Sequence, residues 1–325
     1  MSLRIVLSIL LLSGINVLQP AAAVSEARFL SSADVNDGNA GTIRLLAVAK
    51  AKVLDPVDMQ QRAPDAIRRV ETAVRSIDAK SVVKTLIEPV RTINQYRAGQ
   101  GREVVTGEAF RNELKTLIDT ASVNDTVVIY THSHGLRNGF EDVQPLGGMV
   151  LDLPVRRPPH AGVFLWDEYA DLILRIPAKN VVVLTMSCFS GALIKHLNTP
   201  GMAKKWKDRE QTGRNFVVMT SQNDVLKSEP IRIGNQMLNP FTYAVERALG
   251  GFADGFLASQ GKPSDASKDG KLQLGEVIDY VLHATEQTPS DSILPVNTSK
   301  PQVTGSYKRD AVIGKAPATV PGGQK

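Results

Sequence analysis

The chain alternates between short, mainly apolar runs and longer segments in which apolar residues recur every three or four positions. Apolar runs of strand length lie at residues 42–49, 82–87, 127–130, 181–187 and 216–220. Helical periodicity lies between and after them, at residues 64–77, 106–120, 166–176, 241–249 and 276–283. Strands that alternate with helices predict an α/β fold in which a mostly parallel sheet has helices on both faces.

The two ends of the chain lack this alternation. Residues 1–23 place Arg4 before an apolar stretch that ends in small residues, which is the layout of a secretory signal peptide. Residues 24–41 are polar and predict a flexible arm, whereas residues 288–325 are rich in Pro, Ser, Thr and Lys and predict an extended or disordered tail. The folded domain is therefore expected over residues 42–287.

The signal-like segment also sets where the protein is expected. A cleaved signal predicts a secreted or periplasmic protein that has no membrane partner after cleavage. A retained membrane anchor is the alternative, but the apolar stretch is short for a span and is interrupted by polar residues such as Ser13 and Asn16.

The charge of the chain is mildly basic. There are 38 Lys and Arg residues against 33 Asp and Glu, a net charge of +5 that falls to +4 when Arg4 leaves with the signal. The basic residues are dispersed apart from those at 204–209, and aromatic residues make up only 5% of the chain. Because it has neither a basic stripe nor a stacking platform, the sequence predicts no nucleic-acid partner.

The single cysteine and one histidine each follow a predicted strand. Cys188 ends the run 181–187 and opens a turn that reaches Gly191, and His134 follows the run that ends at Tyr130. Carboxyl ends of neighbouring parallel strands meet at one edge of a sheet, where ligands and chemistry collect. Since a thiolate is a nucleophile and an imidazole can supply its base, this placement predicts a Cys/His hydrolase.

Other uses of these residues remain open at the sequence level. Cys188 alone could be an inert buried residue, and His132 could be a hydrogen-bonded core histidine. A zinc site could combine His132, His134, Cys188 and His160, although paired-cysteine spacings are absent. A serine hydrolase using Ser187 or Ser190 lacks the usual Gly-x-Ser-x-Gly turn.

The sequence around these strand ends resembles that of the caspase-like superfamily of cysteine peptidases (clan CD), and is closest to its legumain-like branch. The two signature segments are 130–135 and 187–191. Agreement continues through a following core strand, a helix with its Gly-Gly-Phe-Ala-Asp end, and an Asp-Gly turn, at residues 216–221, 240–254 and 269–272. Over roughly residues 42–282, the resemblance implies a three-layer α/β/α sandwich with a mostly parallel central sheet.

The resemblance also implies roles for individual residues. Cys188 would be the nucleophile that forms a thioester acyl-enzyme, and His134 its general acid and base. The backbone N–H groups of Gly135 and Cys188 would bind the oxyanion. The expected activity is that of a secreted cysteine endopeptidase acting on a peptide or protein substrate, and the alternative is a catalytically idle binding protein with the same fold.

Four residues are candidates for the substrate pocket, namely His132, Met186, Phe189 and Asp224. The resembling enzymes often have an acidic residue where Met186 stands, and frequently one where Phe189 stands. Without these carboxylates, a preference for Arg or Lys in the substrate loses its usual support. Asp224 is the remaining acidic candidate, although an aspartate in a loop is commonly a turn former.

No cofactor is expected apart from a possible calcium ion. Asp265, Ser267, Asp269, Gly270 and Glu276 match the ligand spacing of a calcium loop. The alternative is a simple turn before the last helix, because the segment that precedes the loop contains a proline and lacks the incoming helix of an EF-hand.

A long basic segment lies between the nucleophile and the next strand. Residues 198–215 predict a surface loop, and cleavage between residues 204 and 214 is a hypothesis that rests on its basic composition and on the position at which caspase-like enzymes are commonly cut.

Overall fold

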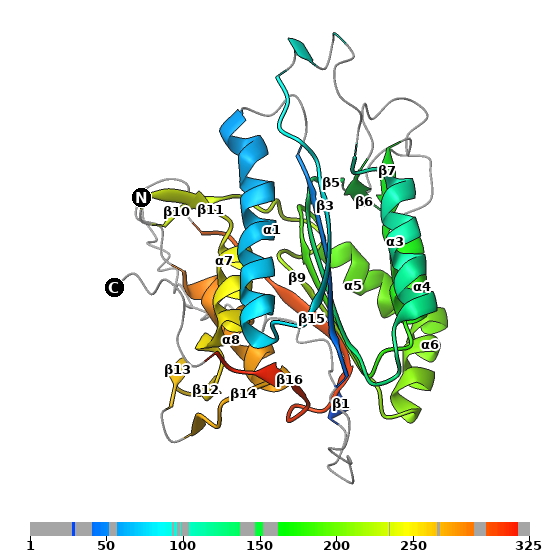
Figure 1. Ribbon diagram of the computed structural model, residues 1–325, viewed down its shortest axis with the longest axis vertical. Helices are drawn as coiled ribbons and strands as arrows, with labels where there is room; N and C mark the ends of the chain where they lie inside the picture. Colours follow the sequence, from blue (N-terminus) through cyan, green and yellow to red (C-terminus); the bar gives the residue numbers. More distant parts are fainter. Residues whose placement is uncertain are drawn as a thin grey trace, which may run out of the picture.

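A seven-stranded sheet forms the centre of the molecule. The computed structural model describes residues 28–29, 41–51, 57–92, 94–95, 98, 104–136, 147–151, 162–233, 235–264, 267–288 and 297–317. The strands lie in the order β1-β15-β9-β8-β4-β2-β3 (Figure 1). Their bounds are β1 Arg28–Phe29, β2 Ile43–Lys50, β3 Val82–Ile87, β4 Thr126–Ser133, β8 Asn180–Met186, β9 Asn215–Thr220 and β15 Gln302–Tyr307.

Five of these strands run parallel, as the alternation of strands and helices predicts. They are β3, β2, β4, β8 and β9 in spatial order, while β15 lies antiparallel to β9. Because the five run the same way, their carboxyl ends share one edge of the sheet.

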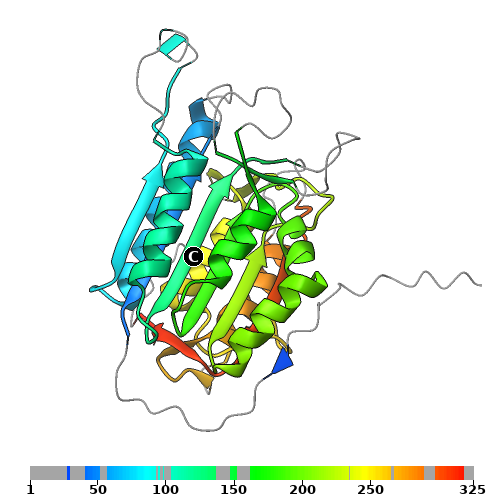
Figure 2. The same cartoon turned by 90° about the vertical axis from the view of Figure 1, so that its right-hand side faces the viewer.

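Helices cover both faces of the sheet, which gives three layers (Figures 1 and 2). On one face lie α1 Val57–Ile77, α7 Pro240–Arg247, the π-helical turn η1 Ala248–Phe252 and α8 Leu274–Gln287. On the other lie α3 Gly107–Thr120, α4 Trp166–Leu174, α5 Gly191–Leu197 and α6 Pro200–Gln211. No helix in the described part of the chain combines the length and the apolar character needed to cross a membrane.

Short strand pairs surround this framework. A three-stranded sheet combines β5 Gly135–Leu136, β6 Gly148–Val150 and β7 Val163–Leu165. Three two-stranded pairs are formed by β10 Ile231–Ile233 with β11 Gln236–Leu238, β12 Phe256–Leu257 with β13 Lys262–Pro263, and β14 Lys271–Gln273 with β16 Val312–Lys315.

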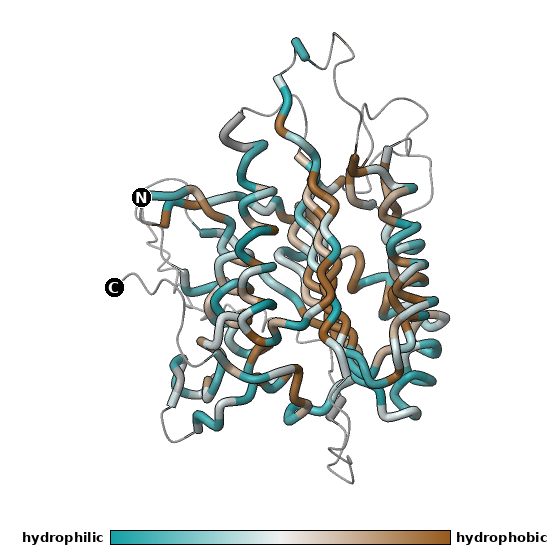
Figure 3. Tube along the Cα trace, viewed as in Figure 1, coloured by the Kyte–Doolittle hydropathy of each residue, from teal (hydrophilic) through white to brown (hydrophobic). Residues whose placement is uncertain are grey.

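The central strands are apolar because both of their faces are buried. In β4, Val128 and Tyr130 pack with α1 and α7 in one core, while Val127 and Ile129 pack with α3 and α4 in the other. The hydropathy colouring accordingly shows the strongest apolar character in the middle layer (Figure 3). Sheets of this kind read as continuous apolar runs rather than alternating ones, which is why the sequence pattern locates them.

The carboxyl-terminal region differs from the sequence prediction. Residues 302–307, placed by sequence in an extended or disordered tail, form β15 and pair with β9 along its length. Residues 312–315 form β16, which pairs with β14. The domain therefore extends past residue 287, because the outer edge of β9 offers backbone hydrogen bonds that a polar strand can satisfy as well as an apolar one.

Two further boundaries are corrected. Helix α1 begins at Val57 rather than Pro64, so that the proline lies inside the helix. The predicted loop 198–215 contains helix α6, which begins with Pro200 and buries Met202, Trp206 and Arg209. The hypothesis of a processing loop there therefore loses its structural basis.

The amino-terminal predictions are only partly covered. Residues 1–23, the predicted signal peptide, lie outside the described residues. Within the predicted arm 24–41, Arg28–Phe29 form β1 beside β15, and residues 30–40 also lie outside the described part.

A buried ion pair fixes the carboxyl end of β2. Lys50 ends that strand, and its ammonium group lies 3.2 Å from Glu88 Oε2 and 2.8 Å from the carbonyl oxygen of Val105. Glu88 also accepts hydrogen bonds from the backbone N–H groups of Val104 and Val105, at 3.1 and 3.0 Å, and from the guanidinium of Arg91. Lys50 and Glu88 are only 2% and 5% exposed, so each charge depends on these partners.

Candidate active site

Cys188 lies in a tight turn between β8 and α5. The next residue, Phe189, has a φ of 57° and is the one non-glycine residue with a left-handed backbone in the described part of the chain. Such a conformation is strained for a bulky side chain and clusters at functional sites. The turn is held from outside by a 2.9 Å hydrogen bond from Phe189 N to the carbonyl of Leu226.

Three buried serines support the turn from within. Ser221 Oγ accepts a hydrogen bond from Ser187 N and donates one to Ser187 O, both at 3.2 Å. Ser190 Oγ lies 3.5 Å from Ser221 Oγ and accepts from Gln222 N at 3.3 Å. Ser187 and Ser190 are fully buried in this network, so neither presents a hydroxyl for the serine-hydrolase alternative.

His134 follows β4, the neighbour of β8 in the sheet. His132 pairs with Met186 in the strand register, so the two strands end side by side. The carbonyl of His134 accepts a 2.9 Å hydrogen bond from Val150 N, which ties it to the small sheet that contains β6. The predicted edge of the parallel sheet therefore brings the two motifs together.

The backbone of Gly135 packs directly against that of Cys188. A Cβ atom built on Gly135 would overlap the carbonyl oxygen of Cys188 and would lie 3.0 Å from Ser187 Oγ. Only glycine fits there. The contact brings together the backbones of the two residues that the resemblance assigns to the oxyanion site.

One cavity of about 130 Å³ joins the thiol and the imidazole. It lies between α1, the start of α7, the β10–β11 hairpin and the loop that precedes that hairpin. Its lining comprises Lys50, Ala51, Arg62, Ala63, Ala66, Arg69, His132, Ser133, His134, Met186, Cys188, Ser228, Pro230, Met237, Leu238, Asn239 and Thr242.

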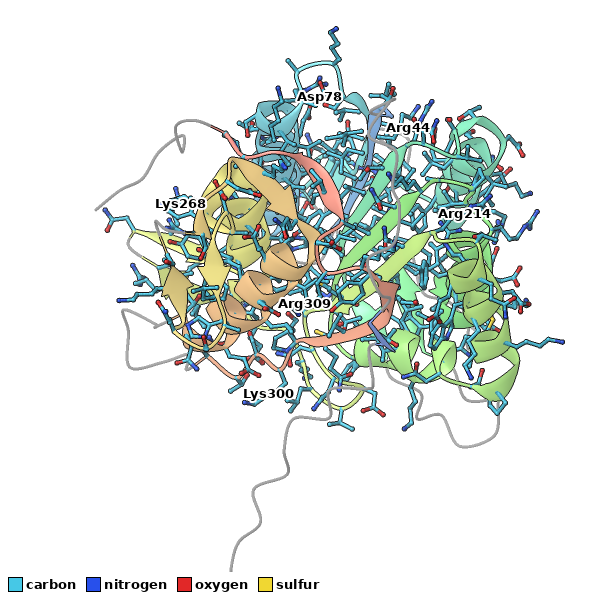
Figure 4. The ribbon with its side chains drawn as sticks, turned by 90° about the horizontal axis from the view of Figure 1, so that it is seen from below. Arg44, Asp78, Arg214, Lys268, Lys300 and Arg309 are labelled. Atoms are coloured by element: carbon cyan, nitrogen blue, oxygen red, sulfur yellow. The ribbon has the colours of Figure 1, made fainter. Side chains whose placement is uncertain are left out.

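Arginines lie at the end of the sheet that is opposite to Cys188 and His134. Arg44 near the start of β2, Arg214 just before β9 and Arg309 just after β15 lie around this end (Figure 4). Arg44 and Arg309 are paired with Asp125 and Asp279. The cysteine and the histidine lie at the other edge, beyond the carboxyl ends of β8 and β4, where enzymes of open α/β folds place their sites.

His132 is held uncharged in this cavity. Burial lowers the pKa of His132 to about 3, and the neighbouring side chains of His134, Arg69 and Arg62 contribute in the same direction. Its Nδ1 lies 3.5 Å from the hydroxyl of Tyr130. The imidazole of His132 is therefore neutral at physiological pH, chiefly because it is buried.

The predicted pocket residues separate into two pairs. His132 and Met186 line the cavity, whereas Phe189 and Asp224 are not among its lining residues. Asp224 Oδ2 instead lies 2.9 Å from the ammonium group of Lys195 at the surface. The hydrogen bonds that form the turn here come from Asn223, whose Oδ1 accepts from Val225 N at 3.0 Å and from Leu226 N at 2.9 Å.

Among the lining residues that were not identified from sequence are Arg62, Arg69, Ser228 and Asn239. The two arginines belong to the polar face of an amphipathic helix, where a charge ordinarily indicates solvent. Asn239 had a usable signal, because Asn before Pro240 is the pattern of a helix N-cap followed by proline at the first helical position. No local pattern marks Ser228.

The calcium prediction is only partly covered. Asp265 lies outside the described residues. Glu276 caps α8, since its two carboxylate oxygens accept from Gly255 N at 2.9 Å and Gln273 N at 3.3 Å, while Asp269 Oδ1 accepts from Lys271 N at 2.9 Å. These bonds fit the simple turn, and calcium stays a prediction.

The zinc alternative is also partly covered. Within the described residues, no three His, Cys, Asp or Glu side chains are grouped to hold a metal ion. His160, the fourth residue of that alternative, lies outside them.

The sheet order, the two helical layers and the position of the site define a caspase-like α/β/α sandwich. Caspase-1 from Spodoptera frugiperda is similar to the chain with a TM-score of 0.50 at 10% identity, over 90% of this chain and 99% of that one. A structural-genomics protein from Geobacter sulfurreducens has a TM-score of 0.45 at 13% identity, over 86% and 99%. The predicted fold class is thereby confirmed.

The comparisons go no further than the fold. No protein-family model matches the sequence, and no curated protein matches it. The likeness to caspase-1 does not distinguish the legumain-like branch, so that part of the resemblance rests on the sequence motifs alone.

Proposed function

We propose that the protein is a secreted cysteine endopeptidase in which Cys188 attacks the scissile carbonyl and His134 transfers the proton. The observation that carries the proposal is the shared cavity, which a thiol on a strained turn and an imidazole on the neighbouring strand both line. Secretion rests on the signal-like pattern of residues 1–23.

The chemistry follows from the residue types. The Cys188 thiolate forms a bond to the carbonyl carbon, and the oxyanion is bound by the N–H groups of Gly135 and Cys188. His134 donates a proton to the leaving amine, which departs and leaves a thioester. Water, deprotonated by the same imidazole, then releases the acid and the free thiol.

A covalent probe tests the proposal. Purified protein is incubated with a library of peptidyl acyloxymethyl ketones, and the adducts are located by mass spectrometry. We expect labelling at Cys188 that is faster than that of a small free thiol, and about 100-fold slower after His134→Ala, the usual scale of general acid–base assistance. Labelling no faster than that of a free thiol, and indifferent to His134, would favour the idle binding protein.

The charge of the cavity favours an acidic substrate side chain. Arg62 and Arg69 line it, and both contribute to the low pKa of His132. No Asp or Glu is among its described lining residues, although Arg69 is paired with Glu246 at 2.9 Å behind the wall. Burial, the largest cause of that low pKa, disfavours any charge at this place, whereas the charges of Arg62 and Arg69 disfavour a cation and favour a carboxylate.

Arg62→Gln tests this preference. We expect wild-type protein to react faster with probes that carry Asp next to the reactive ketone than with those that carry Lys. The ratio of these two rates should be about tenfold lower in the variant. Arg68→Gln is the control, because Arg68 is exposed on the same helix and pairs with Asp65. An unchanged ratio in Arg62→Gln would show that the charge of Arg62 does not select the substrate side chain.

A further inference from the structure

The loop before β10 lies directly against the nucleophile. Ser228 N donates a hydrogen bond to Cys188 Sγ at 3.3 Å, and the thiol is 3.9 Å from the Ser228 carbonyl oxygen. Together with the bond from Phe189 N to Leu226 O, this contact attaches the loop both to the sulfur and to the backbone of the following residue. A backbone N–H pointing at sulfur stabilises the thiolate more than the thiol.

The side chain of Ser228 fixes the position of this N–H. Its hydroxyl accepts a 2.7 Å hydrogen bond from Asn239 Nδ2 and donates to Met186 Sδ at 3.6 Å. Met186 is two residues before the nucleophile, on β8. Ser228 therefore connects the loop to the nucleophile's own strand and to Asn239.

Asn239 is itself held in one orientation. Its Oδ1 accepts from Phe241 N at 3.0 Å and Thr242 N at 3.4 Å, which caps the start of α7. Because the oxygen must face these two donors, the amide nitrogen has to face away from the helix, toward Ser228. The side chain is 7% exposed, so water competes little for either end.

We infer that Asn239 is a positioning residue that, through Ser228, holds a backbone N–H donor against the Cys188 thiolate. The inference rests on the proposed function of Cys188 as nucleophile and adds to it a group outside the Cys/His pair. The start of helix α7 thereby tunes the reactivity of the Cys188 thiol, which follows strand β8.

Alkylation with iodoacetamide across pH tests the inference without any peptide substrate. Asn239→Ser keeps an N-cap oxygen but removes the amide donor, and Ser228→Ala removes the hydroxyl but keeps the backbone N–H. For each variant we expect a rate at pH 7 about tenfold below wild type, the scale of one hydrogen bond to a charged group, and a profile with its midpoint at higher pH. The double variant should be no slower than either single variant, because both act through one path.

Thr106→Ala is the matched control. Thr106 caps α3 by accepting from Ala109 N at 3.0 Å, so its loss weakens a helix start on the face of the sheet opposite to α7. The alkylation profile of this variant should overlay that of wild type. Profiles of Ser228→Ala and Asn239→Ser that also overlay wild type would overturn the inference.

The test separates this inference from the proposed function. If no peptidyl probe labels the wild-type protein, the peptidase proposal fails, but the alkylation profiles still measure whether Asn239 and Ser228 tune the thiol. If probes label Cys188 but the profiles do not move, the peptidase proposal stands and the positioning role is wrong.

Discussion

Gly135→Ala is expected to abolish most of the proposed activity while leaving the sheet folded. The added methyl group would overlap the Cys188 carbonyl oxygen, so either the strand end after β4 or the nucleophile turn must move. A displacement of about 1 Å at a catalytic group can cost about 100-fold in rate, and we expect at least that loss in the rate of probe labelling at Cys188. Circular dichroism should show retained secondary structure.

Gly201→Ala is the matched control for this substitution. Gly201 lies in helix α6, and a Cβ there meets nothing within 4 Å. We expect wild-type labelling and a stability that is unchanged or raised by up to about 1 kcal/mol, because alanine favours a helix. If Gly135→Ala labels as fast as Gly201→Ala, the backbone at Gly135 does not take part in the site.

Glu88→Gln is expected to cause a large loss of stability. The amide cannot accept at both of its terminal atoms, so at least one of the donors around Glu88 loses its acceptor, while Lys50 and Arg91 keep their charges in the interior. Breaking a buried ion pair by removing one partner costs about 3–5 kcal/mol, and we expect a decrease of this size in the free energy of unfolding measured in urea.

The effect of Glu88 should depend on pH. Burial by itself raises the pKa of Glu88, but the hydrogen bond from Val105 N–H and the charge of Lys50 outweigh it and bring the pKa below the ordinary value of 4.5. A carboxylate with a lowered folded-state pKa stabilises fully above its unfolded value, and this contribution is lost as the pH falls through the folded value. The difference in the free energy of unfolding between wild type and Glu88→Gln should therefore be constant near neutrality and should decrease below pH 4.5.

Asp65→Asn makes the same chemical change at an exposed ion pair. Asp65 pairs with Arg68 on the surface of α1, and such pairs contribute about 1 kcal/mol or less. We expect almost no change in stability for Asp65→Asn at any pH between 5 and 8. A Glu88→Gln variant as stable as Asp65→Asn would mean that the interior pair is not needed for folding.

The sequence was most informative where both faces of a strand are buried. The runs at 127–130 and 181–187 became β4 and β8, and their polar ends brought His134 and Cys188 to one cavity. Adjacent parallel strands need no further information to align their ends, because the sheet fixes the register. This is why the candidate pair could be identified without the fold.

Contacts between segments far apart in the chain could not be predicted from the sequence pattern. Ser228 and Asn239 approach Cys188 through a loop whose course is set by hydrogen bonds to Leu226 and to Met186, not by any local periodicity. Strand β15 was missed because a strand with few apolar side chains has the composition of a tail.

Strand β15 completes the sheet late, because it lies near the end of the chain. The carboxyl-terminal segment contacts the nucleophile's turn, because Lys300 N donates to Gln222 Oε1 at 2.9 Å and Gln222 N in turn donates to Ser190 Oγ. During synthesis β9 therefore remains an open edge until residues 302–307 emerge. We expect the edge that carries the proposed active site to form fully only when translation is complete. A chain cut short before residue 302 should then lack the proposed activity and should tend to pair its exposed β9 strand with another molecule.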